Sequence, residues 1–150
     1  MTRILFICLG NICRSPAADG IMRHIVRERG LGAEIAVDSA GTYAGHTGEL
    51  PDARMRRAAA RRGYDLGHRA RQIREAVSYT HLRAHENVHR LAPSRRAAEK
   101  IFRMREFFRR HSRWDHVPDP YYEGAEGFEL VLDMLEDGCG GILEYLENPQ

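Results

Sequence analysis

A short segment near the N-terminus combines a thiol and a guanidinium with glycine and asparagine. Residues 8–15 read Cys-Leu-Gly-Asn-Ile-Cys-Arg-Ser, after an apolar run at residues 4–7 and before Pro16. This order predicts a buried strand, a tight loop and the start of a helix. Backbone N–H groups of such a loop and the positive end of the helix dipole bind tetrahedral oxyanions. The segment therefore predicts a phosphate site, with Cys8 at its floor and Arg14 at its rim.

The side chains of this loop each have a chemical use at such a site. The N–H groups, the helix end and a nearby cation stabilise the thiolate of Cys8, which is the nucleophilic form of cysteine. Arg14 offers a planar fork that grips two phosphate oxygens. Gly10 and Asn11 tolerate unusual backbone conformations, and Ser15 can either cap the helix or hydrogen-bond the thiolate. A Cys-x5-Arg pattern alone also fits a buried structural cysteine, but the surrounding residues favour catalysis.

Phosphoryl transfer from an oxygen ester also needs an acid that protonates the leaving group. Residues 117–122 read Val-Pro-Asp-Pro-Tyr-Tyr and follow a predicted short strand. Prolines on both sides stiffen the loop around Asp119, and rigid placement suits a general acid. Alone, this aspartate fits an ordinary turn equally well. Beside a phosphate cradle it becomes the candidate acid.

Alternating strands and helices must position these residues. Apolar runs predict strands, apolar residues three and four apart predict helices, and Gly30 and Gly63 end two of the helices. Strands that alternate with helices form a parallel sheet covered on both faces, with ligands at the carboxyl ends of the strands. The sequence thus predicts one α/β domain over residues 1–150, with Cys8 at a strand end. The predicted strands are 2–9, 33–40 and 114–117, and the predicted helices are 15–29, 51–62, 126–146 and one that Pro93 and Ser94 open, with apolar members from Ile101 to Phe108.

Charge and cysteine content narrow the class of protein. The net charge of +2 is too small to indicate a nucleic-acid partner. The arginines within 54–62 and 103–113 fit helix faces that are exposed to solvent. Three cysteines form an odd set without a disulfide framework, which suits a reducing compartment. Cys139 lies on the apolar stripe of the last predicted helix and fits a core position. Without a recognisable leader or membrane-spanning run, we expect a cytoplasmic protein with no membrane partner.

Two motifs together resemble the low molecular weight protein tyrosine phosphatases. The first is Cys-x-Gly-Asn-Ile-Cys-Arg-Ser-Pro near the N-terminus, and the second is Asp-Pro-Tyr-Tyr near the C-terminus. Asp38–Thr42 and Gly67–Ile73 are similar to further signatures of the family, in the same order. The resemblance covers residues 2–74 and 91–146. It implies a doubly wound, three-layer α/β/α fold around a central four-stranded parallel sheet.

The resemblance implies a protein-tyrosine-phosphatase that needs neither a cofactor nor a metal. The Cys8 thiolate attacks phosphorus and forms a cysteinyl-phosphate, while Arg14 and the loop N–H groups hold the phosphate oxygens. Asp119 protonates the departing phenolate and then activates the water that hydrolyses the intermediate. The implied phosphate-binding residues are Leu9, Gly10, Asn11, Ile12, Cys13, Arg14 and Ser15.

The resemblance also assigns supporting and pocket residues. Asn11 would fix the loop conformation, and Ser15 would stabilise the thiolate. His68 and Ser39 would hold Asn11 in place. Gly45 stands where family members often carry a large aromatic residue, which predicts a more open pocket rim. The implied pocket wall consists of Tyr43, His46, Tyr121 and Tyr122.

Cys13 has two interpretations. On oxidation it could form a disulfide with Cys8 and protect the nucleophile from over-oxidation. It could equally be a small apolar filler, and the residues alone do not decide between the two.

The segment Ala76–Glu86 departs from the family, which has an apolar central strand at this place. A buried parallel strand should be a continuous apolar run, but this segment carries His81, Arg83 and His85. It could form a weak strand over Val77–Leu82, loop out of the sheet, or be foreign sequence from a recombination or a sequencing error. Because this strand would help to align Asp119 with Cys8, the departure leaves open a protein that binds phosphate with impaired catalysis.

Two functions compete with the phosphatase hypothesis. One is a protein that binds oxyanions without turnover. The other is a thiol-dependent arsenate reductase, which needs a downstream cysteine pair, whereas the chain offers only Cys13 and Cys139 beyond the nucleophile. The expected partner of the phosphatase is a phosphotyrosine-bearing protein or a small aryl phosphate, and we expect a monomer or a weak dimer.

Overall fold

The strand β1 (Thr2–Cys8) lies inside the sheet and leads into residues 8–15, the predicted phosphate loop. In the computed structural model, which describes residues 1–73 and 100–148 together with the backbone of 81–83, β1 is buried from Ile4 to Cys8. Ile4 and Phe6 belong to the hydrophobic core, while Leu5 and Ile7 are buried outside that cluster. Because successive side chains of a strand face opposite sides, β1 is covered on both faces, as its continuous apolar run predicts.

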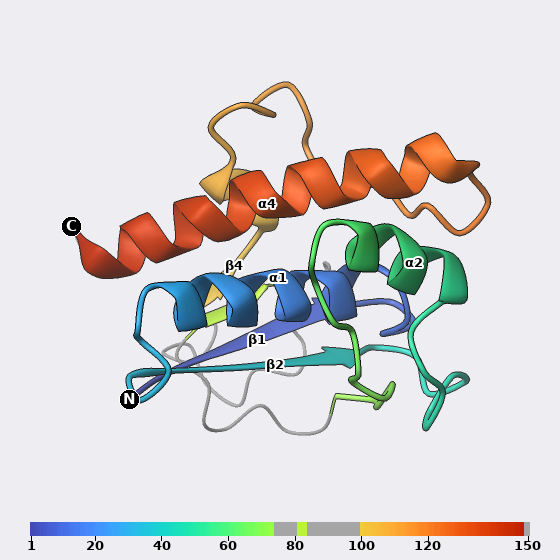
Figure 1. The fold of residues 1–150 in the computed structure, drawn as a ribbon, viewed down its shortest axis with the longest axis horizontal. Coiled ribbons are helices and arrows are strands. Elements are labelled where there is room, and N and C mark those ends of the chain that lie inside the picture. Colours follow the sequence, from blue (N-terminus) through green and yellow to red (C-terminus); the bar gives the residue numbers. More distant parts are fainter. Residues whose placement is uncertain (74–80, 84–99, 149–150) are drawn as a thin grey trace.

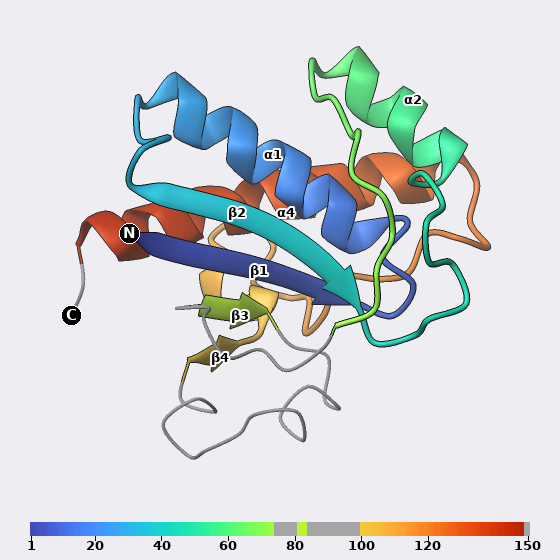
Figure 2. The same cartoon turned by 90° about the horizontal axis from the view of Figure 1, so that it is seen from below.

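The sheet of the described residues has the strand order β2-β1-β3-β4, and every pair is parallel. β2 (Ile35–Gly41) pairs with β1 along its full length, from Thr2↔Ile35 to Cys8↔Gly41. β3 (His81–Arg83) and β4 (Ile101–Phe102) follow on the other side of β1. The chain therefore leaves β1 first toward one edge and later toward the other, and this switch point is where ligands bind in such sheets. Figure 2 shows β1 and β2 ending side by side, where the loop leads into the first helix.

Two long helices cover the same side of β1 and β2 (Figure 1). They are α1 (Arg14–Glu28) and α4 (Ala125–Glu147), and their apolar faces form the core with β1 and β2. Gly30, with a φ of 69°, ends the turn after α1, a left-handed conformation that suits glycine. The predictions for both helices, and for the strands 2–9 and 33–40, are confirmed. Among the described residues, no helix combines the length and the apolar character that crossing a membrane requires.

The helix α2 (Ala53–Arg61) packs beside α4 and is also where the sequence predicts a helix. The Asp52 carboxylate caps it by accepting a hydrogen bond from the N–H of Arg54. At its other end the Arg62 guanidinium lies 2.9 Å from the Asp133 carboxylate of α4. The arginine-rich helix face is thus partly an interface with α4.

Two predictions of secondary structure in the C-terminal half of the chain are wrong. Ile101–Phe108 is not a helix: Ile101–Phe102 forms β4, and Met104–Phe107 forms a 3₁₀ helix. The aromatic spacing that suggested a helix instead brings Phe102 and Phe107 to within 5.8 Å of the Tyr145 ring on α4. Residues 114–117 form no strand, because the chain there turns at Trp114, whose N–H donates to the His111 carbonyl. Pro93 and Ser94 lie outside the described residues.

The segment that departs from the family contributes a short strand. The backbone of β3 pairs with β1 at two positions and with β4 at two positions, in the centre of the sheet. Of the three alternatives, the backbone of residues 81–83 supports the weak strand, while residues 76–80 and 84–86 lie outside the described residues. The fold is therefore an α/β fold with a parallel sheet. The described helices α1 and α4 lie on one side of β1 and β2, and the three-layer arrangement stays a prediction.

Candidate active site

The phosphate loop connects β1 to α1 and places a thiol at its base. Cys8 is buried at the end of β1, and its Sγ lies 3.0 Å from the hydroxyl of Ser15. The N-terminus of α1 has no acidic residue in its first turn and no side-chain cap. Of the two uses predicted for Ser15, the structure therefore shows the contact with the thiol and not the cap. The loop has the elements that stabilise a thiolate and an anion above it.

The backbone of the loop is shaped by Asn11 and by close packing. Asn11 adopts a left-handed conformation with a φ of 56°, as its residue type predicts. Gly41, at the end of β2, approaches the loop so closely that a Cβ atom would lie 2.7 Å from the Leu9 carbonyl oxygen. Gly10 is not left-handed, and its place is tight because His46 packs over it. The loop is therefore held against the sheet on one side and covered by a neighbouring loop on the other.

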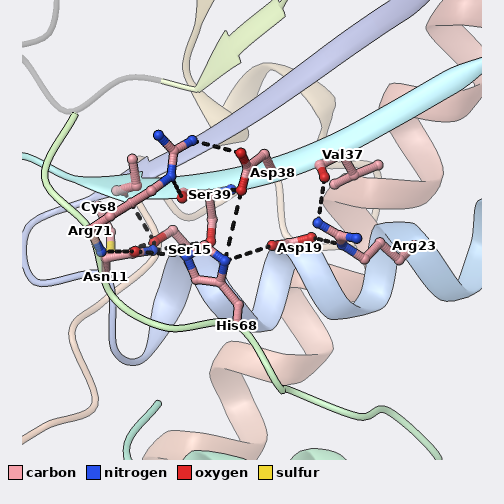
Figure 3. A network of polar contacts seen from close by, with 11 residues as sticks. Cys8, Asn11, Ser15, Asp19, Arg23, Val37, Asp38, Ser39, His68 and Arg71 are labelled. Atoms are coloured by element: carbon pink, nitrogen blue, oxygen red, sulfur yellow. Dashed lines mark hydrogen bonds and ion pairs between the residues drawn. The ribbon is translucent and has the colours of Figure 1, made fainter. Parts of the chain in front are cut away.

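Asn11 is the centre of a buried hydrogen-bond network (Figure 3). Its Nδ2 donates to the hydroxyls of Ser15, at 2.8 Å, and Ser39, at 3.1 Å. Its Oδ1 accepts from His68 Nε2 and from the backbone N–H of Arg71, each at 3.0 Å. The four residues predicted as a supporting network are thus brought together, and the network ends on the hydroxyl that contacts Cys8.

A second layer of charges lies behind His68 (Figure 3). His68 Nδ1 is 3.9 Å from Asp19 Oδ2 and 3.8 Å from Asp38 Oδ1. Burial lowers the pKa of His68, and the two carboxylates offset only part of this effect. Because His68 Nε2 faces an amide oxygen, it carries the ring proton in the neutral form. This proton is what ties His68 to Asn11.

The same three side chains also offer the donor types of a metal site. Asp19, Asp38 and His68 have ligand atoms within 4.8 Å of one another. However, Arg23 binds the Asp19 carboxylate, and Arg71 Nη2 lies 2.7 Å from Asp38 Oδ2. These guanidinium groups already neutralise both carboxylates, so a further cation would meet no net negative charge. The cluster fits the positioning of Asn11 better than metal binding.

The predicted acid lies beside the arginine of the phosphate loop. Arg14 Nη2 is 3.6 Å from Asp119 Oδ2, and Arg14 Nη1 donates to the Val117 carbonyl at 3.2 Å. The Arg14 side chain is 17% exposed and that of Asp119 is 44% exposed, so the acid is the more accessible of the two. Asp119 Oδ1 accepts a hydrogen bond from the N–H of Tyr121 at 3.1 Å. Arg14 therefore holds residues 117–122, here called the acid loop, directly against the phosphate loop.

A single cavity joins these groups to the predicted aromatic walls. Its volume is about 260 Å³, and Cys8, Arg14 and Asp119 all line it. On one side the rings of Tyr43 and His46 meet edge to face, 6.0 Å apart, and on the other the rings of Tyr121 and Tyr122 do so at 5.0 Å. The remaining lining residues are Leu9, Gly10, Ile12 and Cys13. All the residues predicted as nucleophile, acid, anchor and wall are thus found around one space.

The three cysteines are buried thiols that form no disulfide, and they differ in their surroundings. Burial, reinforced by the nearby carboxylates of Asp52 and Asp119, raises the pKa of Cys13 to about 12. Cys13 therefore stays a thiol at neutral pH. The Cys139 thiol lies in the core 3.7 Å from the Ala18 carbonyl, as its place on the helix predicts.

Sequence reasoning missed two residues next to the site, Asp52 and Arg54. The backbone N–H of Asp52 donates to the Ile12 carbonyl of the phosphate loop at 2.7 Å. The Arg54 guanidinium lies 5.3 Å from the centre of the Tyr121 ring. An aspartate before a helix signals a cap, so Asp52 was open to prediction in that role. Its contact with the loop is a tertiary feature without a local sequence signal.

Comparison with known proteins gives a consistent picture. The family model for "Low molecular weight phosphotyrosine protein phosphatase" matches residues 3–150. A putative low molecular weight protein-tyrosine-phosphatase of Synechocystis is 40% identical over 151 residues, with 96% of each chain covered. A low molecular weight protein-tyrosine-phosphatase of Streptomyces coelicolor is 41% identical, covering 94% of this chain and 91% of that protein. The crystal structure of a protein tyrosine phosphatase from Entamoeba histolytica with Hepes in the active site has a TM-score of 0.91 and 35% identity, and covers 98% of this chain and 97% of that chain. The phosphate loop, the acid beside it and these likenesses agree, and the chain belongs to the low molecular weight phosphotyrosine protein phosphatase family.

Proposed function

We propose that this protein hydrolyses phosphotyrosine and related aryl phosphate esters through a cysteinyl-phosphate intermediate. The observation that carries the proposal is the single cavity lined by Cys8, Arg14 and Asp119. A nucleophile, an anion anchor and a proton donor around one space are the groups that phosphate ester hydrolysis requires.

The first step transfers the phosphoryl group to the enzyme. The loop N–H groups and the Arg14 guanidinium bind the three non-bridging oxygens of the phosphate. The Cys8 thiolate, beside the Ser15 hydroxyl at 3.0 Å, attacks phosphorus and forms the S–P bond. The P–O bond to the phenol breaks at the same time, and the Asp119 carboxyl gives its proton to the leaving oxygen.

The second step regenerates the thiolate. Asp119, now a carboxylate, takes a proton from a water molecule whose oxygen attacks phosphorus. The S–P bond breaks, its electron pair returns to Cys8, and inorganic phosphate leaves. Before phosphate binds, Arg14 Nη1 donates to the Val117 carbonyl at 3.2 Å, so the loop at residues 117–122 already lies beside the phosphate loop.

The walls of the cavity support an aromatic leaving group. The rings of Tyr43, His46, Tyr121 and Tyr122 line the space, and aromatic rings pack favourably on one another in edge-to-face or offset arrangements. A phosphotyrosine side chain on a protein, or a small aryl phosphate, would place its ring between them. We assign no metal or cofactor to either step.

The setting of this activity is also part of the proposal. We assign residues 1–150 to one domain with the doubly wound, three-layer arrangement of the family around a four-stranded parallel sheet. We place the protein in the cytoplasm as a monomer or a weak dimer. Free cysteines support a reducing compartment.

Cys13 is proposed as the redox partner of Cys8. Both thiols are buried at the phosphate loop, and each lines the cavity. The raised pKa of Cys13, about 12, keeps it protonated, so Cys8 remains the nucleophile toward phosphate. Oxidation of Cys8 by a peroxide to a sulfenic acid would let the Cys13 sulfur displace water and close a disulfide, which a thiol reductant reopens.

One observation favours an alternative, a protein that binds phosphate with impaired catalysis. The described part of the central strand, β3, carries His81 and Arg83, and within the described residues it pairs with β1 at two positions, whereas β2 pairs with β1 at seven. A weak central strand would loosen the alignment between the phosphate loop and the acid loop, and misplacement by about 1 Å costs on the order of a hundredfold in rate.

Hydrolysis of para-nitrophenyl phosphate separates the two possibilities. We expect turnover in the wild-type protein and none in Cys8→Ser. Asp119→Ala should lower kcat about a hundredfold, because Asp119 also takes the proton from water in the second step, whatever the leaving group. Binding of inorganic phosphate or orthovanadate by a wild-type protein that shows no turnover would contradict the proposed function and support the alternative.

A further inference from the structure

Asp52 connects the phosphate loop to the start of α2. Its backbone N–H donates to the Ile12 carbonyl at 2.7 Å, and its carboxylate caps the helix through the N–H of Arg54 at 2.8 Å. The same carboxylate holds the Arg54 guanidinium, with Nε 3.1 Å from Oδ1 and Nη2 2.9 Å from Oδ2. This hydrogen bonding lowers the pKa of Asp52, so the carboxylate is ionised at neutral pH. The guanidinium is therefore fixed relative to the phosphate loop.

The guanidinium lies close to two aromatic rings from different parts of the chain. Its central carbon is 4.8 Å from the centre of the Phe128 ring, which is buried in α4. It is 5.3 Å from the centre of the Tyr121 ring, which belongs to the acid loop. A planar guanidinium interacts favourably with aromatic faces at these distances. The backbone N–H of Tyr121 in turn donates to Asp119 Oδ1 at 3.1 Å.

We infer that Arg54 is a positioning residue that holds the acid loop, and with it Asp119, in register with the phosphate loop. The contacts run from Ile12 through Asp52 to the guanidinium, and from there through Tyr121 to the acid. This inference rests on the proposed function, because it gives Arg54 a role in leaving-group protonation.

Arg54 differs from the other link between the two loops. Arg14 also contacts the acid loop, but it lines the cavity, and a bound phosphate would take up its guanidinium. Arg54 is not among the described residues that line the cavity, so a phosphate bound there does not compete for its guanidinium. It can therefore keep the acid in place during the step in which the proton moves.

A positioning role for the acid predicts a dependence on the leaving group. Para-nitrophenolate leaves readily without a proton, whereas phenolate is a stronger base and needs one. Arg54→Ala should therefore lower kcat/KM, which reports the step that releases the phenol, about tenfold more for phenyl phosphate than for para-nitrophenyl phosphate, a part of the factor that a well-placed acid supplies. Arg54→Lys keeps the charge but not the planar fork, and it should show the same trend.

The decisive measurement compares kcat/KM for the two substrates in each variant, together with inhibition by inorganic phosphate. The ratio of two kcat/KM values from one sample does not depend on the fraction of folded protein, so partial unfolding cannot imitate the effect. Arg57→Ala is the matched control, because Arg57 is an exposed arginine on the same helix. It should leave the ratio unchanged, and the inhibition constant for phosphate should stay the same in all three variants.

The double variant Arg54→Ala/Asp119→Ala completes the test. If Arg54 acts through Asp119, the double variant loses no more activity than Asp119→Ala alone. An equal loss on both substrates, a weaker inhibition by phosphate, or a further loss in the Asp119→Ala background would overturn the inference while leaving the proposed function intact. A wild-type protein without turnover would overturn the proposed function itself, and this role with it.

Discussion

Asn11 is the residue on which the phosphate loop depends most. A carboxamide has two donor hydrogens and one oxygen with two lone pairs, and Asn11 uses all four in contacts of 2.8 to 3.1 Å. It is fully buried and left-handed, a conformation that asparagine tolerates better than most residues. Aspartate would lack the donors and glycine would lack all four groups. The residue type is therefore determined by its partners and by its backbone together.

Removing the Asn11 side chain should damage both stability and phosphate binding. In Asn11→Ala the buried hydroxyls of Ser15 and Ser39 and the His68 ring lose a partner, and we expect a loss of about 2 kcal/mol in the free energy of unfolding. Urea unfolding and phosphate binding by calorimetry measure the two effects. Asn148→Ala, at the exposed end of α4, is the control and should stay close to wild type. An Asn11→Ala protein with unchanged phosphate affinity would contradict this account of the loop.

Asp137 predicts a pH-dependent contribution to stability. Its carboxylate, buried in α4, accepts the backbone N–H groups of Arg109, Arg110 and His111 at 2.9 to 3.2 Å, and His111 Nδ1 at 2.9 Å. Burial raises the pKa of Asp137, but the hydrogen bonds from His111 and the backbone outweigh this and hold the pKa below the usual value of an aspartate. A pKa that is lower in the folded state stabilises the protein above the unfolded value, and this stabilisation is lost as the pH falls through the folded value.

Asp137→Asn should therefore be less stable than wild type at pH 7 by about 2 kcal/mol, the cost of weakened hydrogen bonds to a buried group. The difference should shrink as the pH falls below 4 and the wild-type carboxyl becomes protonated. Urea unfolding of both proteins at a series of pH values tests this. A difference that stays constant from pH 7 to pH 3 would show that the charge of Asp137 does not contribute.

At the scale of elements, the loop between β2 and α2 carries an aromatic side chain that packs against a glycine. Gly45 predicts a more open rim, and the Tyr43 ring lies next to this glycine. A Cβ at position 45 would lie 2.2 to 2.3 Å from three atoms of that ring. The backbone N–H of Tyr43 donates to the Leu9 carbonyl of the phosphate loop at 2.9 Å. This bond fixes the backbone position from which the Tyr43 side chain extends. Gly45 thus allows Tyr43 to serve as the aromatic wall.

Adding one methyl group at this position should change the pocket. Gly45→Ala should displace the Tyr43 ring and raise KM for an aryl phosphate about fivefold, the factor that one aromatic pair contributes. Inhibition by inorganic phosphate, which needs no wall, should not change. In a Tyr43→Ala background the same methyl group should have no effect. An equal rise in KM with and without the Tyr43 ring would contradict the role of the ring.

The elements that the sequence predicts well are those with local signals. β1 is a continuous apolar run, and α1 and α4 have apolar residues three and four apart, so each is determined within its own segment. β4 is not: two residues become a strand only because β3 lies beside them. Residues 114–117 have the composition of a strand but find no partner among the described strands. Whether these two segments form strands depends on pairing with distant segments. The local sequence pattern carries no information about such pairing.

The same distinction applies to the site. Cys8, Arg14 and Asp119 are predictable, because their residue types and neighbours carry a chemical meaning. Arg54 was missed because its place near Tyr121 and Phe128 follows from the packing of α2 against α4 and the acid loop. A solvated arginine and one that positions a loop look alike in the sequence.

At the scale of the whole molecule, the site is made from four segments that are far apart in the chain. The phosphate loop, Ser39 at the end of β2, His68 before the sheet bridge at Gln72, and the acid loop meet at the carboxyl edge of the sheet. The parallel sheet is what brings them together. The proposed chemistry therefore depends on a sheet whose strand β3 comes from the segment that departs from the family.

Trapping of the phosphorylated enzyme tests the central claim most directly. Wild-type protein is mixed with excess para-nitrophenyl phosphate, the release of para-nitrophenolate is followed by stopped flow, and acid-quenched samples are analysed by peptide mass spectrometry. The account predicts phosphate on Cys8, with an initial burst wherever hydrolysis of the intermediate limits turnover, and neither signal in Cys8→Ser. A burst of para-nitrophenolate with no phosphate on Cys8, or phosphate binding without any release of para-nitrophenolate, would contradict the claim that nucleophile, anchor and acid meet in one working site.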